Sequence, residues 1–148
     1  MTHWQPTPEM IQRELDLCER LSKAWGRTVE MQHKKSVFDA IAHVNNVPKA
    51  FVELRIINYG YYDLPDIMIS LTKCFAGRQQ TEITGLPSLF VVHWLKDDRI
   101  GVININKTYL GEPDFRVSKR NMKRLNDPDE IEVCRHVKTS QFKMVSEI

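Results

Sequence analysis

The sequence lacks long apolar runs, an excess of charge of either sign, and paired cysteines. No stretch approaches the roughly 20 consecutive apolar residues that cross a lipid bilayer. Residues 1–8 are polar and lack the apolar run of a secretory signal peptide. Together these absences predict a protein that does not associate with membranes and, by default, one that is cytoplasmic.

Charge and cysteine content exclude some kinds of site but not others. The 21 Lys and Arg residues and the 19 Asp and Glu residues leave a net charge of +2, which neither requires nor excludes a nucleic-acid partner. The three cysteines, Cys18, Cys74 and Cys134, are far apart and form no C-x-x-C pair. A zinc knuckle or a redox dithiol is therefore not expected, and the thiols are expected to be reduced and buried.

The composition that is present is typical of one globular domain. Hydrophobic residues make up 42%, charged residues 27% and aromatic residues 9%, which excludes a mainly disordered chain. The 148 residues contain no internal repeat and no linker-like segment, so we predict a single domain over residues 1–148. A domain of this length buries about 70% of the surface that its unfolded chain exposes, and therefore can hold a core without disulfides.

The pattern of caps and apolar residues predicts the order of the elements. Thr7 and Pro8 suit the start of a helix and Gly26 suits its end. Two β-rich runs, 37–44 and 49–57, are separated by turn residues and predict an antiparallel hairpin. A second helix is predicted to start between Asp66 and Ser70 and to end at Gly85, with strands over 88–95, 100–105 and 131–137. This order predicts an α/β or α+β fold with helices packed on a central sheet.

One carboxylate of the first predicted helix lies where apolar residues are expected. At 100° per residue, Glu14 falls near the middle of the stripe formed by apolar residues at helical spacing, namely Ile11, Leu15, Cys18, Leu21 and Trp25. A carboxylate there is costly unless it is paired, protonated or bound to a metal. Two interpretations stay open: a salt bridge or a water-exposed end of the helix, and a role in a functional site.

The hairpin places two further acids inside apolar strands. A turn centred near residue 46 pairs residues whose numbers sum to about 92, which puts Asp39 opposite Glu53 on the same face. Like charges in that arrangement call for a cation. Arg55 shares the face of Glu53 because side chains alternate along a strand. The three residues could form a structural ion cluster, or Asp39 and Glu53 could hold a divalent metal while Arg55 faces a phosphate.

The same residues resemble a known family. Asp39 on one strand and Glu53-Leu54-Arg55 on the next are similar to the Asp and Glu-x-Lys motif of the PD-(D/E)xK nuclease superfamily, and Glu14 matches the Glu that its first helix usually carries. Longer segments resemble small phage- and prophage-encoded members. These segments are Phe51-Val52-Glu53-Leu54-Arg55, Tyr62-Asp63-Leu64-Pro65, Met68-Ile69-Ser70-Leu71-Thr72-Lys73, Thr84-Gly85-Leu86-Pro87 and Leu89-Phe90-Val91-Val92-His93-Trp94.

The resemblance implies a fold, an activity and a metal site. It implies a restriction-endonuclease-like core, in which a central mixed sheet is flanked by helices, and a metal-dependent nuclease that hydrolyses DNA phosphodiester bonds. Asp39, Glu53 and the Leu54 carbonyl would hold Mg²⁺ or Mn²⁺, because hard oxygen ligands suit these ions. Glu14 would hold a water or a second metal. A phage origin would place the protein in the host cell cytoplasm, and a homodimer is possible.

The sequence departs from the family at the motif's cation. The usual Lys is Arg55, which can clamp a phosphate but stays charged and cannot exchange a proton near neutral pH. Lys73 could supply the missing ammonium, because some superfamily members carry this Lys on the following helix. Its helical angle does not fall on the stripe set by Leu71, Cys74 and Phe75, so a solvated side chain is the alternative.

Two further segments carry side chains that suit nucleic acid. Aromatic residues stack on bases and cations follow the phosphate backbone, although loop tyrosines often cap a core and basic runs are often solvated. The candidates are Tyr59, Tyr61 and Tyr62 in the loop after the hairpin, and Arg116, Lys119, Arg120, Lys123 and Arg124.

Two other functional hypotheses remain. The chain could be a catalytically inactive member of the superfamily that binds nucleic acid or another protein. It could also be an unrelated α+β protein in which Asp39, Glu53 and Arg55 form a structural salt-bridge cluster. A cleft in which Asp39, Glu53 and Glu14 converge would favour the nuclease or the inactive superfamily member over the unrelated α+β protein.

Overall fold

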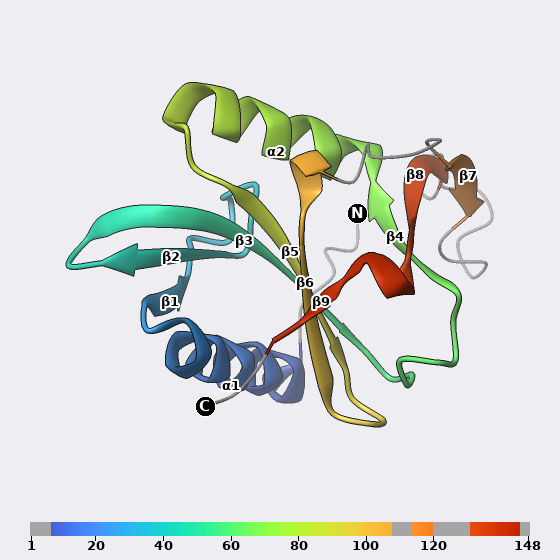
Figure 1. The fold of residues 1–148 in the computed structure, drawn as a ribbon, viewed down its shortest axis with the longest axis horizontal. Helices are drawn as coiled ribbons and strands as arrows, with labels where there is room; N and C mark the ends of the chain where they lie inside the picture. The colour runs from blue at the N-terminus through green and yellow to red at the C-terminus, as the bar shows by residue number, and fades with distance from the viewer. Residues whose placement is uncertain (1–6, 108–113, 120–130, 146–148) are drawn as a thin grey trace.

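The computed structural model describes residues 7–107, 114–119 and 131–145. In these ranges a six-stranded mixed sheet carries one helix on each face, and a small three-stranded sheet lies beside the second helix (Figure 1). The helices are α1 (Pro8–Trp25) and α2 (Leu71–Thr84). The strands are β1 (Thr28–Met31), β2 (Ala40–Val44), β3 (Val47–Ile57), β4 (Asp66–Ser70), β5 (Ser88–Trp94), β6 (Arg99–Asn104), β7 (Phe115–Lys119), β8 (Ile131–Lys138) and β9 (Lys143–Met144).

The strand order explains why the sheet is mixed. The large sheet has the order β1-β2-β3-β5-β6-β9, and the small sheet has the order β4-β8-β7. Strand β3 pairs in parallel with β5 because the chain crosses over through β4 and α2 between them, whereas the other pairs are antiparallel. This arrangement confirms the predicted mixed sheet flanked by helices. No helix in the described ranges has both the length and the apolar character to span a bilayer.

Helix α1 begins and ends where the sequence predicted. The Thr7 hydroxyl accepts a hydrogen bond from the Met10 N–H, and Gly26 closes the helix at a φ of 63°. The predicted buried face is confirmed only in its second half, because Cys18 and Leu21 are buried whereas Ile11 and Leu15 are 45% and 48% exposed. The residues that pack on the sheet are Leu17, Cys18, Leu21 and Trp25, so only the second half of α1 covers the core. The first half, which carries Glu14, stays accessible.

The predicted hairpin has a shorter turn than expected. Asn45 and Asn46 both have positive φ, 50° and 66°, which is typical of the two-residue turn that joins twisted antiparallel strands. Strand β3 therefore starts at Val47 and not after Pro48. The sum of 92 is confirmed from Ala40–Val52 to Ala42–Ala50, and a bulge shifts the register after Ala42. Residues 37–39, predicted as strand, precede β2.

The start of the second helix was placed a few residues too early. Residues 66–70 form β4, whose burial alternates residue by residue as in a half-buried strand. Ser70 is the N-cap of α2, and its hydroxyl accepts from the Lys73 N–H. The predicted end is confirmed, since Gly85 adopts a φ of 75°. The cap matters for the site because it fixes the first turn of α2, which holds Lys73.

Two cores lie on opposite faces of the large sheet. One contains the second half of α1, and the other contains α2 and the aromatic residues Phe38, Phe90, Trp94 and Phe142. Strand β5 contributes to both, and Val91, Val92 and Trp94 are fully buried, as expected for a continuous apolar strand. Phe142 packs against Trp94 at 5.6 Å between ring centroids, and so holds the C-terminal segment on the sheet.

Substitution of Gly101 should test the packing of that segment. A Cβ at this position would lie 2.9 Å from Trp94 Cζ3 and 3.0 Å from Phe142 Cβ. We expect Gly101→Ala to lower the free energy of unfolding by about 1–3 kcal/mol through overpacking, measured by urea unfolding. Gly60→Ala is the control, because the nearest atom to its Cβ is the movable Asp63 carboxylate at 3.2 Å. Equal losses in both variants would contradict the packing argument.

Candidate active site

Asp39 and Glu53 meet where β2 and β3, the two strands of the hairpin, separate. The Leu54 N–H donates to Asp39 Oδ2 at 3.0 Å, and the Asp39 N–H donates to Glu53 Oε1 at 3.3 Å. The predicted neighbourhood of the two acids is therefore present, although Asp39 lies one residue before β2. Glu53 is nearly buried, with a side chain that is 12% exposed. Both carboxylates thus lie at one point, in the fork between β2 and β3.

The fork also leaves main-chain groups of β3 directed at Asp39. The Phe51 N–H and the Ile57 carbonyl bond to the β5 side of β3, and alternate residues of a strand bond to opposite neighbours. Leu54 therefore directs its N–H and its carbonyl to the β2 side, where its N–H already binds Asp39. An oxygen of the main chain accordingly faces the same place as the two carboxylates, as the family resemblance implied.

Glu14 reaches this place from α1. It is half-buried, and the pKa of its carboxyl is raised by burial and by the nearby charge of Asp39. Glu14 and Asp39 line two adjoining cavities, one of about 400 Å³ and one of about 600 Å³. The two acids therefore stand at the boundary between neighbouring hollows, which opens the carboxylate cluster to a ligand.

Lys73 is the cation that contacts Glu53. Its Nζ lies 3.1 Å from Glu53 Oε2 and 3.2 Å from Oε1, and it also donates to the Val37 carbonyl. It lies 5.7 Å from the centroid of the Phe38 ring. The apolar stripe of α2 gave little support for Lys73 as a site residue. Such a stripe indicates which side chains face the core, whereas Lys73 contacts Glu53 of β3.

Arg55 lines the smaller of these cavities together with Glu14 and Asp39. Its guanidinium lies 5.7 Å from the centroid of the Phe90 ring, on the face of β3 that also carries Glu53. Arg13 lines the same cavity and was missed in the sequence, because it lies outside the apolar stripe of α1. Both arginines thus line the cavity that Glu14 and Asp39 also line, and Arg13 pairs with Glu9 at 2.8 Å.

The protonation of Glu53 reflects competition among its neighbours. Burial and the Asp39 carboxylate raise the pKa of Glu53 to about 7, although Lys73 lowers it. Burial with Glu14 and Asp39 also raises the pKa of the Cys18 thiol to about 11. Near neutral pH the cluster therefore carries less negative charge than its composition suggests, and an added cation would stabilise its ionised form.

The donor set fits a hard divalent cation that keeps part of its hydration shell. Among the described residues, no group of three or more His, Cys, Asp or Glu is placed to enclose a metal. Mg²⁺ needs no such group, because it is usually held by one or two carboxylates and completes its octahedron with water and phosphate oxygens. Asp39, Glu53 and the Leu54 carbonyl offer oxygen atoms of that kind, and none of the three is a thiolate of the type that structural zinc sites use.

Among the other predicted residues, those that the structure describes do not line the cavities at Glu14 and Asp39. Tyr61 and Tyr62 line a separate cavity with Arg116, while Tyr59 is 53% exposed in the same loop. Lys119 is the last residue of β7. The remaining basic candidates, Arg120, Lys123 and Arg124, lie outside the described residues. Their roles in nucleic-acid binding stay predictions.

Comparison with known proteins identifies the family. The model of the family described as "Phage putative PDDEXK endonuclease" matches residues 7–145. The chain therefore belongs to this family, and the resemblance found in the sequence is confirmed. No curated protein sequence matches the chain significantly.

Two solved structures share the fold. Hjc, a Holliday junction resolvase from the archaeal hyperthermophile Archaeoglobus fulgidus, has 11% identity and a TM-score of 0.59, covering 93% of this chain and 92% of its own. D212, a nuclease from a fusselovirus, has 14% identity and a TM-score of 0.58, covering 99% and 92%. At such low identity these likenesses show the fold alone, and they confirm the restriction-endonuclease-like core.

The raised pKa of Glu53 predicts a pH dependence of stability. Between about pH 4.5 and 7 the folded carboxyl keeps a proton that the unfolded chain has released, so the contribution of Glu53 to stability is full below this range and falls as the pH rises. At about 1.4 kcal/mol per pH unit, the loss totals about 3 kcal/mol. We expect urea unfolding of metal-free protein to show this loss, and Glu53→Gln to remove it.

Glu82→Gln is the matched control, because Glu82 is exposed on α2 and pairs with Arg78. This variant should keep the pH dependence of the wild type. At pH 8 we expect Glu53→Gln to be as stable as the wild type or more so, since it removes one of two crowded charges. A loss of about 3–5 kcal/mol at pH 8 would instead indicate a structural ion cluster.

Proposed function

We propose that this chain is a divalent-metal-dependent nuclease that hydrolyses phosphodiester bonds of DNA, with Asp39 and Glu53 as metal ligands. The observation that carries the proposal is the contact between these two carboxylates at a fork that also presents the Leu54 carbonyl and opens beside Glu14. Membership in a family of phage endonucleases supports it, as does the general dependence of PD-(D/E)xK nucleases on divalent metals.

The residues of the site divide the work by chemistry. Asp39, Glu53 and the Leu54 carbonyl would hold Mg²⁺ or Mn²⁺, which supplies Lewis acidity and a nucleophile at neutral pH when bound. Glu14, half-buried beside Asp39, would orient a water or take part in holding a second ion. Arg55 would bind the phosphate through its planar fork of N–H groups and offset its negative charge.

Lys73 would serve as the cation that the motif lacks at Arg55. Its ammonium contacts both oxygens of Glu53. Lys73 therefore joins the carboxylates from helix α2, whereas the usual Lys of the motif lies on the strand. An ammonium there can orient a water or stabilise charge that develops on the phosphate. With its flexible stem, the Lys73 ammonium would shift from Glu53 to a bound phosphate if a metal took its place at that carboxylate.

The proposed substrate, DNA, is inferred from the family. DNA is the substrate expected of a phage endonuclease, and the host cytoplasm is then the expected location. A homodimer stays a prediction, which light scattering of the purified protein checks.

Cleavage assays should establish the activity and its ligands. We expect the wild type to cut at least one of linear, nicked, branched or single-stranded DNA with Mn²⁺ or Mg²⁺, and Asp39→Asn to lower the rate by about 100-fold or more. Asp16→Asn is the control, because Asp16 is exposed on α1 and bonds only locally to Gln12. A second readout is the melting temperature, which Mn²⁺ should raise in the wild type but not in Asp39→Asn.

Exchange of the two cations should show which one supports hydrolysis. We expect Lys73→Ala to lower the cleavage rate by about 100-fold, and Arg55→Lys to raise the rate of the wild type and to restore activity to Lys73→Ala. Lys49→Ala is the control, since Lys49 is exposed in the hairpin. If no DNA form is cut with either metal and Arg55→Lys restores nothing, the inactive nucleic-acid-binding or protein-binding module becomes the better account.

A further inference from the structure

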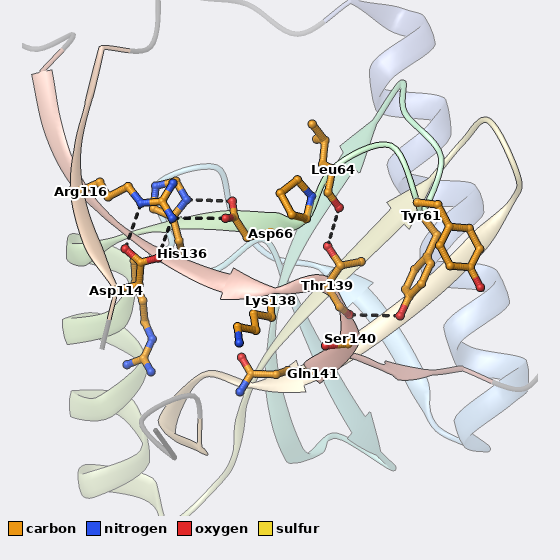
Figure 2. A pocket seen from close by; sticks show the side chains of 13 residues that line it. Tyr61, Leu64, Asp66, Asp114, Arg116, His136, Lys138, Thr139, Ser140 and Gln141 are labelled. Atoms are coloured by element: carbon orange, nitrogen blue, oxygen red, sulfur yellow. Dashed lines mark hydrogen bonds and ion pairs between the residues drawn. The ribbon is translucent and has the colours of Figure 1, made fainter. Parts of the chain in front are cut away.

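A second site-sized cavity lies away from the carboxylates. It measures about 620 Å³ and is bordered by the loop that holds Tyr61 and Tyr62 and by strands β7 and β8 of the small sheet. None of its lining residues lines the cavities at Glu14 and Asp39. Figure 2 shows an ion-pair network on one side of this cavity and Tyr61 on the other, with Lys138 and Gln141 between them.

The aromatic side of the cavity is held in place from behind. Tyr61 packs edge-on against Trp94 at 5.2 Å between centroids, and its hydroxyl donates to the Thr139 carbonyl at 3.5 Å. The Arg99 guanidinium lies 5.1 Å from the Tyr61 ring and 5.0 Å from the Tyr62 ring. Tyr62 is nevertheless 78% exposed. A large aromatic ring is thus positioned by its neighbours while most of its surface faces solvent.

The opposite side of the cavity is a braced ionic network. The Arg116 guanidinium lies 2.6 Å from the Asp114 carboxylate and 3.5 Å from that of Asp66. His136 Nδ1 lies 2.8 Å from Asp66 Oδ1. These contacts link β7, β8 and β4, and they hold Arg116 against two acids. The network therefore shapes this wall, and the binding of an anion falls to other cations.

Lys138 is the cation best placed for an anion. It is exposed, and it lines the cavity together with the Gln141 amide and the buried Arg135, whose guanidinium stacks on Phe115 at 5.8 Å. The described lining thus combines the exposed Tyr62 ring, the Gln141 amide and the exposed Lys138 ammonium. A base can stack on such a ring, and an ammonium and an amide can donate hydrogen bonds to a phosphate.

We propose that this cavity binds one unpaired nucleotide, with its base stacked on Tyr62 and its phosphate at Lys138. Bases inside a duplex are stacked on one another, so only a single-stranded or displaced nucleotide can offer its face to a tyrosine. The inference rests on the proposed function for the identity of the ligand, since DNA would then contact the protein both here and at the carboxylates. It names an unpaired strand as part of the substrate.

The sequence alone could not join these groups. The tyrosine loop and Arg116 are separate candidates in the chain, and both were predicted to contact nucleic acid. Strand β8 lies between β4 and β7 in the small sheet, and this order brings residues 61–66 and 114–116 to one cavity. A cavity of this volume lies in the range of ordinary small-ligand sites.

Binding without cleavage tests the inference. Fluorescence anisotropy of the full chain in EDTA should show that a labelled 12-residue oligothymidine binds more tightly than a 12-base-pair duplex. We expect Tyr62→Ala to weaken binding of the single strand about tenfold, as loss of one base stack predicts, and Lys138→Gln to weaken it severalfold. Phe75→Ala and Lys49→Gln are matched controls, because both residues are exposed and neither lines the cavity.

The outcomes separate this inference from the proposed nuclease. Loss of single-strand affinity in Tyr62→Ala but not in Phe75→Ala supports the nucleotide site, whether or not the protein cuts DNA. A rise in the melting temperature with thymidine monophosphate, in the wild type but not in Tyr62→Ala, also supports a site for one nucleotide. Equal binding by wild type and Tyr62→Ala, or equal losses in the two aromatic variants, overturns the inference even if cleavage depends on Asp39.

Discussion

The contact between two largely buried carboxylates, Asp39 and Glu53, is the constraint on which the site depends. Burial and the charge of Asp39 both oppose ionisation of Glu53. Strand β3 cannot withdraw Glu53, because this residue pairs with Phe90 of β5 and the preceding Val52 pairs with β2. Relief must come from a proton or a cation. The pKa of Glu53 near 7 and the ammonium of Lys73 at 3.1 Å are these two forms of relief in the metal-free protein.

The geometry of the fork turns this repulsion into a binding site. Because β2 begins at Ala40 while β3 continues to Ile57, the last part of β3 has no antiparallel neighbour at Asp39. The main-chain groups of Leu54 therefore face the Asp39 carboxylate and not another strand. Glu14 borders the same opening because the first half of α1 extends beyond the core that its second half covers.

The two faces of the sheet supply different parts of the molecule's chemistry. Helix α1, on one face of the sheet, contributes Glu14. Helix α2, on the other face, contributes Lys73 from its capped first turn. The crossover that makes β3 and β5 parallel also carries β4, and β4 anchors the small sheet. The cavity at Tyr61 and Tyr62 thus depends on the same crossover connection that brings Lys73 to Glu53. The described residues that line it differ from those that line the cavities at Glu14 and Asp39.

Local patterns in the sequence determined the elements and the acid pair, and contacts across the chain decided how they are used. Caps at Thr7 and Gly26, and the register that joins Asp39 to Glu53, depend on neighbours in the chain and could be predicted. The accessibility of Ile11 and Leu15, the strand at 66–70 and the position of Lys73 could not, because each depends on which element packs against it. Apolar residues at helical spacing predict which side of a helix can be buried, but only the tertiary structure decides which half of α1 packs on the sheet. Likewise, Lys73 contacts Glu53 from the first turn of α2, a contact between residues 20 positions apart that the helical pattern alone does not predict.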